Sequence, residues 1–180
     1  RVQKFKSFVF QEVRWADSSG GLKLIITIMA RANSRSICSG CGGHAPRYDI
    51  GLPRLYEFVP LWGIATFFEY ARWRVHCGRC GVRVEAVPWA EGKHTLTTTY
   101  MHFLAAWARR LSWKEVAEVF QTSWGKVFRS VQWMVQWGLA IRDAKWLGLG
   151  DSPFATDRTG SDEHPERVWV PIGDGVDHGR

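Results

Sequence analysis

The sequence predicts an α+β fold in which a β-rich part precedes a helical part. Three observations lead to this prediction. Apolar, β-branched and aromatic runs separated by turn residues fill the first half, two short cysteine-glycine motifs stand within it, and apolar residues recur with a helical period after Lys93. We therefore divide the chain into a β-rich domain at residues 1–92, a helical domain at residues 93–147 and an irregular tail at residues 148–180, where glycine and proline interrupt every period.

The first element is a β-hairpin. Residues 5–15 and residues 22–31 are rich in aromatic and β-branched side chains, which favour strands. Between them, Asp17-Ser18-Ser19-Gly20-Gly21 is typical of a turn. The hairpin leads directly into the first cysteine motif.

All four cysteines of the chain stand in two motifs, which we call the first knuckle (Cys38-Ser39-Gly40-Cys41-Gly42) and the second knuckle (Cys77-Gly78-Arg79-Cys80-Gly81). In each motif a tight turn can aim two thiolates at one point, and the final glycine keeps that turn free of a clashing side chain. Four such sulfurs can surround Zn²⁺ as a tetrahedron at about 2.3 Å. The sequence therefore predicts a four-cysteine zinc ribbon with Cys38, Cys41, Cys77 and Cys80 as ligands of a structural Zn²⁺.

The 35 residues between the knuckles exceed the roughly 15–20 of an ordinary ribbon. Residues 55–59 and 64–76 are strand-like, and residues 82–87 form a short exit strand, so we expect a sheet that brings the two turns together. Three alternatives stay open: two structural disulfides, a redox C-x-x-C, and replacement of one thiolate by His44 or His76.

The helical domain follows the plan of a helix-turn-helix. A first helix is indicated by apolar residues at helical spacing, namely Tyr100, Phe103, Leu104, Trp107, Ala108 and Leu111. Ser112 and Glu115 then form a capping box that starts a short second helix. Thr122 or Ser123 caps a third helix, whose expected apolar face is Trp124, Val127, Phe128, Val131 and Val135. In this plan the third helix enters the major groove of DNA.

The outer face of the third helix supplies the candidate DNA contacts, which are Ser123, Lys126, Arg129, Ser130 and Gln132. Arginine can grip guanine with two hydrogen bonds, serine and glutamine read base edges, and lysine holds phosphate. The alternative is a plain three-helix bundle whose polar face is only hydrated.

Charge is unevenly distributed. Residues 1–147 hold 21 Lys and Arg against 10 Asp and Glu, whereas residues 148–180 hold 3 against 7. A basic body suggests double-stranded nucleic acid as the partner, although a solvated basic surface explains the charge equally well. No apolar run reaches the roughly 18 residues of a membrane span, and no signal peptide is evident, so we expect a cytoplasmic protein that contacts no membrane.

The order of these parts resembles the N-terminal half of bacterial insertion-sequence transposases of the ISL-three family, over roughly residues 5–145. The resemblance rests on both knuckles and on the segments Arg47-Tyr48-Asp49, Phe58-Val59-Pro60-Leu61-Trp62-Gly63, Arg74-Val75-His76, Glu85-Ala86-Val87-Pro88-Trp89-Ala90 and Leu111-Ser112-Trp113-Lys114-Glu115-Val116-Ala117. It implies recognition of the terminal inverted repeats of the element for DNA transposition, and action as a homo-oligomer near the bacterial nucleoid.

The resemblance also implies a downstream RNase-H-like domain, in which a DDE carboxylate triad holds two Mg²⁺ ions. The nearest match to its first aspartate is Asp162, in Thr159-Gly160-Ser161-Asp162-Glu163, and Asp151 is a weaker candidate. The tail at residues 148–180 is then the truncated or frame-shifted start of that domain. The chain lacks a complete triad, so we expect it to be inactive alone and leave open whether it is an enzyme.

Two other functions fit the same sequence. One is a non-catalytic transcriptional regulator built from a zinc ribbon and a helix-turn-helix. The other is a zinc-dependent protein-interaction module that presents exposed tryptophans.

Overall fold

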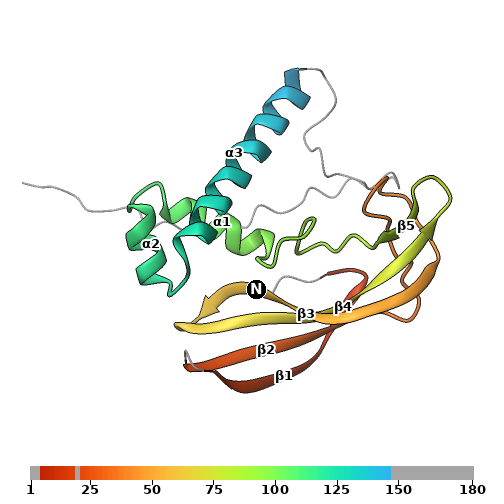
Figure 1. Ribbon diagram of the computed structural model, residues 1–180, viewed down its shortest axis with the longest axis horizontal. Coiled ribbons are helices and arrows are strands. Elements are labelled where there is room, and N and C mark those ends of the chain that lie inside the picture. The colour runs from red at the N-terminus through yellow and green to blue at the C-terminus, as the bar shows by residue number, and fades with distance from the viewer. Residues whose placement is uncertain (1–4, 19–20, 147–180) are drawn as a thin grey trace, which may run out of the picture.

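The computed structural model describes residues 5–18 and 21–146, and within them the chain has a mixed α+β fold (Figure 1). One sheet precedes three helices in the described part of the chain. The elements are β1 Phe8–Ser18, β2 Gly21–Ala30, β3 Arg47–Leu61, β4 Ile64–Cys77, β5 Gly81–Val84, α1 Thr98–Trp107, α2 Trp113–Val119 and α3 Trp124–Trp146.

The strands lie in the order β1-β2-β4-β3, and β5 pairs with the end of β4. β1 and β2 are antiparallel, as the predicted hairpin requires. β2 and β4 are parallel, with Lys23 opposite Ala65, and this pairing joins the hairpin to the strands between the knuckles. β3 and β4 form a second, longer antiparallel pair. β4 is therefore the central strand, and it runs from the helices to the second knuckle.

β3 is longer than the sequence predicts. We expected a strand at residues 55–59, but β3 begins at Arg47 and passes through Pro53. Proline lacks the N–H that a central strand needs. It is tolerated here because β3 lies at an edge of the sheet and its register shifts between Ile50 and Pro53.

A crossing segment (residues 85–97) covers the sheet and connects its two ends (Figure 1). Its Trp89 is buried against aromatic side chains of the strands. The resulting core consists of Phe5, Ile28, Tyr56, Phe68, Tyr70, Val87, Trp89 and Ala90. Near its end, the backbone of the segment pairs with β3, where Glu57 N–H donates to the Thr95 carbonyl at 2.7 Å.

The helices have a second core, which consists of Leu96, Tyr100, Met101, Leu104, Val116, Ala117 and Val127. The Thr97 hydroxyl accepts from the Tyr100 N–H and caps α1. The predicted capping box is confirmed: the Ser112 side chain accepts from the Glu115 N–H, and the Glu115 carboxylate accepts from the Ser112 N–H. α1, α2 and the first turns of α3 thus pack as one unit beside the sheet.

The turn between β3 and β4 offers a test of backbone strain. Trp62 has φ 50° and Gly63 has φ 77°, so both loop residues of this hairpin are left-handed. Asn-Gly is the favoured pair in such turns, whereas a tryptophan there costs about 1 kcal/mol. Because Trp62 is 95% exposed, its removal gives up little burial. We expect Trp62→Asn to raise the free energy of unfolding by about 1 kcal/mol in a urea titration.

Trp62→Ala is the matched control, since it removes the same indole but keeps a residue that disfavours positive φ. A gain for the alanine variant equal to that of the asparagine variant would show that the indole, and not the backbone, is the source of strain.

His102 on α1 makes the helical unit sensitive to pH. Its ring lies against Trp133 and Trp137, with centroids at 5.1 and 5.3 Å. Burial lowers the pKa of His102, and Glu91 partly opposes this effect. The folded chain therefore favours the neutral ring, so this contribution to stability is complete above about pH 6.5 and is lost as the pH falls below it.

We expect the unfolding temperature of the parent chain to drop more between about pH 7.5 and about pH 5.5 than that of His102→Gln, measured by helical circular dichroism. The two chains share every other titrating group, so their difference isolates this imidazole. Equal drops would show that His102 titrates alike in the folded and unfolded chains.

Candidate metal centre

The four predicted cysteines meet at one point. The first knuckle lies between β2 and β3, Cys77 is the last residue of β4, and Cys80 lies just before β5. All four Sγ atoms lie within 4.8 Å of one another, and Cys41 Sγ is 3.6 Å from Cys77 Sγ. Sulfurs at about 2.3 Å from a tetrahedral ion are about 3.8 Å apart. The cluster therefore has the dimensions to hold a metal ion.

Each knuckle turns on its last glycine. Gly42 has φ 69° and Gly81 has φ 71°, a backbone conformation that residues with a Cβ rarely adopt. Within the first turn, the Gly40 N–H donates to Cys38 Sγ at 3.4 Å. The glycine after each C-x-x-C thus supplies a left-handed residue to the turn. The clash that the sequence suggested is not seen at Gly81, where an added Cβ would meet no atom within 4 Å.

Backbone pairing holds the two knuckles together. The β3–β4 hairpin returns the chain to its starting point, with Arg47 opposite Val75. On the other side, the Ala86 N–H donates to the Ile37 carbonyl at 2.8 Å and the Ser39 N–H donates to the Val84 carbonyl at 3.3 Å. The long insert therefore does form a sheet that brings both turns to one site.

The two cysteines of the second knuckle have opposite pKa shifts. Backbone N–H groups of Arg79 and Cys80, with the neighbouring thiol of Cys41, lower the pKa of Cys77 to about 6. The hydrogen bond with Cys41, together with burial, raises the pKa of Cys80 to about 12. Four thiolates this close would repel one another, so full deprotonation of the cluster requires a cation among the sulfurs.

The structure also bears on the alternatives for this site. All four cysteines are free, and no disulfide joins them. His44 and His76 are exposed and lie outside the group of side chains that could hold the ion.

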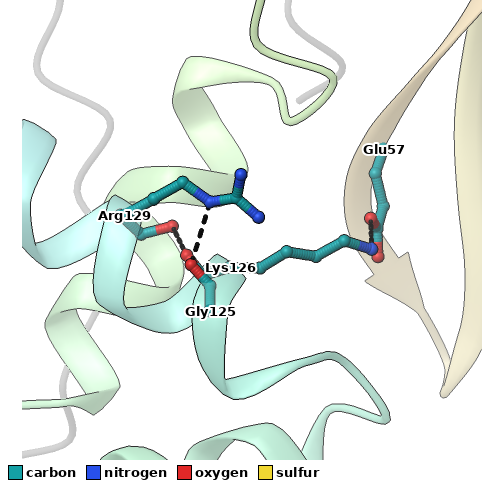
Figure 2. Close-up of polar contacts among 5 residues, drawn as sticks. Glu57, Gly125, Lys126 and Arg129 are labelled. Carbon is teal, nitrogen blue, oxygen red and sulfur yellow. Dashed lines mark hydrogen bonds and ion pairs between the residues drawn. The ribbon is translucent and has the colours of Figure 1, made fainter.

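The predicted DNA-contacting residues divide into two sets. Arg129 and Gln132 are exposed on α3, and Ser123 is exposed just before it. Lys126 instead reaches across to β3, where its Nζ lies 2.6 Å from the Glu57 carboxylate (Figure 2). That ion pair is partly buried and joins the helical unit to the sheet. Nothing in the sequence signals it, because 69 residues separate the partners.

Ser130 was wrongly placed on the outer face of α3. It is fully buried, and its hydroxyl donates to the Lys126 carbonyl at 2.8 Å. The predicted apolar face of α3 is also partly wrong, because Val127 is buried but Trp124 and Val135 are 53% and 55% exposed.

Some of the residues to which the sequence analysis gave a role lie outside the described part of the chain. Asp162, Asp151 and the whole tail at residues 148–180 fall outside the part that the structure describes. Within the described part, no helix is both long and apolar enough to cross a membrane.

Comparison with known proteins gives no match to a family model, to a curated protein or to a solved structure. What the chain does must therefore be inferred from its own residues.

Proposed function

We propose that this chain is the DNA-binding part of a transposase of the ISL-three type, and that it binds the terminal inverted repeats of an insertion sequence. The observation that carries the proposal is the combination, in one basic chain, of a four-cysteine cluster with a helical unit that exposes Arg129. We assign Zn²⁺ to the cluster, because four thiolates in a tetrahedral arrangement are the preferred ligands of structural zinc.

The helix-turn-helix assignment draws support from the connection between α2 and α3. Four residues join the two helices, and Gln121 among them has φ 49°. Such a left-handed residue turns the chain sharply after α2. A capped short helix, a tight turn and a long helix are the parts from which DNA-binding helix pairs are built.

The exposed face of α3 carries the proposed base contacts. The Arg129 Nε–H donates to the Gly125 carbonyl at 3.0 Å, which orients the guanidinium beside the start of the helix (Figure 2). Its Nη atoms have no hydrogen-bond partner within the described residues, so both can donate to guanine. Gln132 on the same helix and Ser123 just before it are also exposed. Lys126 acts here as a tether, since Glu57 already occupies its ammonium group.

The metal cluster and the sheet have a positioning role in this proposal. They fix the helical unit through the Lys126–Glu57 pair and the crossing segment, so that α3 can lie against a duplex without reordering. The chemistry of strand transfer, with its Mg²⁺ ions, would belong to carboxylates outside the described residues.

Selection from a random duplex pool tests the proposal. We expect the metal-loaded chain to enrich one sequence, and its affinity to fall steeply between about 50 mM and about 200 mM salt. Arg129→Ala should lose about 1–3 kcal/mol on the selected duplex and discriminate less against a scrambled one. Fluorescence anisotropy measures both quantities.

Arg54→Ala is the matched control for charge, because Arg54 is exposed on β3 and does not belong to the helical unit. It should leave discrimination between the two duplexes unchanged. If the parent chain enriches no sequence, or if Arg129→Ala and Arg54→Ala behave alike, the base-reading role is wrong.

A protein-interaction module is the second candidate, and one observation favours it. α3 exposes a line of large apolar side chains, which are Trp124, Phe128, Val135 and Leu139. No Asp, Glu, Lys or Arg occurs between Arg129 and Arg142. A chain that ignored DNA at about 50 mM salt, but formed a complex that Val135→Glu abolished in sedimentation experiments, would support this candidate instead.

A further inference from the structure

A hollow of about 460 Å³ lies beside the first knuckle, and its lining residues come from the segment between β2 and β3 and from the first residue of β3. It is lined by Ser34, Arg35, Ser36, His44, Ala45, Pro46 and Arg47. Two arginines, a histidine and two hydroxyl groups thus surround the space, and no carboxylate lines it. Neither the metal cluster nor the face of α3 accounts for this composition.

Arg47 is held in the hollow by neutral groups. Its Nε–H donates to Ser36 Oγ at 3.1 Å, and its Nη2 donates to the carbonyl and the hydroxyl of Ser34 at 3.2 and 3.1 Å. Its guanidinium also lies over the Trp73 ring, 5.1 Å from the centroid. The side chain is therefore fixed in direction, and little conformational entropy remains to be lost on binding.

The charge of Arg47 is not compensated by an ion pair, in contrast to other arginines of the sheet. Arg14 pairs with Glu69, and Arg74 pairs with Asp49. Among the described residues no carboxylate forms a salt bridge with Arg47. The buried Glu85 instead accepts from the Tyr70 hydroxyl and the Trp73 N–H.

Two arms of the chain bring the cationic groups together. Ile37 and His44 pair as an antiparallel bridge, and the Ala45 N–H donates to the Ser36 carbonyl at 3.0 Å. This pairing places Arg35 on one arm and His44 and Arg47 on the other. Arg35 and His44 are exposed, so their charge and hydrogen-bond donors are available at the rim.

We propose that this hollow binds a phosphate group, with Arg47 as the fixed guanidinium and Arg35 as a mobile second cation. Nε–H and Nη2 of Arg47 already donate to Ser36 and Ser34, so its Nη1 is the group left to donate to phosphate oxygens. Ser36, which accepts from Arg47, keeps its hydroxyl hydrogen to donate to a further oxygen. In the DNA-bound chain the ligand is a phosphodiester of the duplex backbone. The assignment of the phosphate group to a DNA backbone rests on the proposed function, whereas the affinity of the hollow for phosphate does not.

The first arm of the test uses inorganic phosphate and the metal-loaded chain. Nuclear magnetic resonance should show saturable shifts of the Arg47 Nε–H and of the amides of residues 34–47, and equal chloride should not reproduce them. Arg35→Ala and Arg47→Gln should each weaken phosphate binding about tenfold. Arg31→Ala is the control, because it removes an exposed charge three residues before Ser34 without touching the hollow.

The second arm measures binding to the selected duplex. Arg35→Ala should weaken binding equally to selected and scrambled duplexes and reduce the salt slope by about 1, as loss of a single phosphate contact does. Arg47 also orders Ser34 and Ser36, so Arg47→Gln is interpreted only if it still binds metal and keeps the amide signals of the sheet. If Arg47→Gln fails this check, Arg35→Ala alone provides the test.

The outcomes separate the two proposals. If Arg31→Ala weakens the phosphate-induced shifts as much as Arg35→Ala does, the hollow is only part of a general basic surface. That result would overturn the inference. Phosphate binding with an unchanged affinity for DNA would overturn the duplex as the source and assign the hollow to a free phosphate compound. Saturable phosphate binding by a chain that binds no DNA would sustain the site and reject the proposed function.

Discussion

Chelation of the Zn²⁺ that we propose for the four-cysteine cluster is expected to unfold the knuckle end of the sheet and to leave the helical unit folded. Among the described residues, the buried core cluster at this end consists of Cys38, Ala45, Val75 and Cys77, which is too small to order two loops without an ion. A structural zinc site contributes about 10 kcal/mol or more of binding free energy, and that energy is available only to the folded loops. Amide signals of residues 34–47 and 77–86 should therefore collapse on chelation.

The helices should keep most of their circular dichroism, because their core is separate from that of the sheet and Val59 is the main strand residue that packs against it. Cys38→Ser should reproduce the effect of the chelator, whereas Ser39→Ala in the same turn should not. Elemental analysis of the parent chain should return one zinc for each chain. A purified chain that contained no metal and unfolded at the same temperature as a zinc-loaded one would contradict both the ligand set and its structural role.

The second large effect concerns Trp89 in the crossing segment. Five aromatic rings have centroids within 6.4 Å of the Trp89 ring, which belongs to the largest fully buried side chain of the described residues. Truncation of such a side chain leaves a cavity that the surrounding strands cannot fill. We expect Trp89→Ala to lower the free energy of unfolding by about 3–5 kcal/mol in a urea titration.

Two variants make this prediction specific. Trp62→Ala deletes the same side chain from an exposed turn and should lower stability by less than about 0.5 kcal/mol. Trp89→Phe should cost far less than Trp89→Ala, because the indole Nε1 is buried without a hydrogen-bond partner and its loss relieves a desolvated donor. Similar losses for Trp89→Ala and Trp62→Ala would mean that the crossing segment does not close the core.

The features that the sequence predicted well are local. The spacing within each knuckle defines a turn of a few residues, so the four sulfurs could be assigned to one site without knowledge of the sheet. Ser112 and Glu115 stand three residues apart, and their reciprocal hydrogen bonds depend on nothing outside that turn. The β1–β2 hairpin is local in the same sense, since its turn and both strands are contiguous.

The features that it missed depend on distant partners. The first part of β3, which contains Pro53, was missed because the sequence does not say that this strand lies at an edge of the sheet. We predicted that Ser130 is exposed because the apolar residues of α3 suggested a buried face. The face that is buried in the structure is turned about the helix axis relative to that prediction. The buried face of α3 is determined by its contact with α1 and by the Lys126–Glu57 pair. Neither contact can be recognised from neighbouring residues in the sequence. The parallel pairing of β2 with β4 likewise joins segments about forty residues apart.

The length of β4 sets a lower limit on any duplex that touches both ends of the protein. Its 14 residues extend over about 45 Å, at about 3.3 Å for each residue. B-form DNA completes a turn in about 34 Å, so a straight duplex spanning this distance contains about 13 base pairs. Oligonucleotides of a single helical turn could then engage the helices or the cysteine end, but never both at once, and affinity should rise in a step when the probe becomes long enough to bridge them.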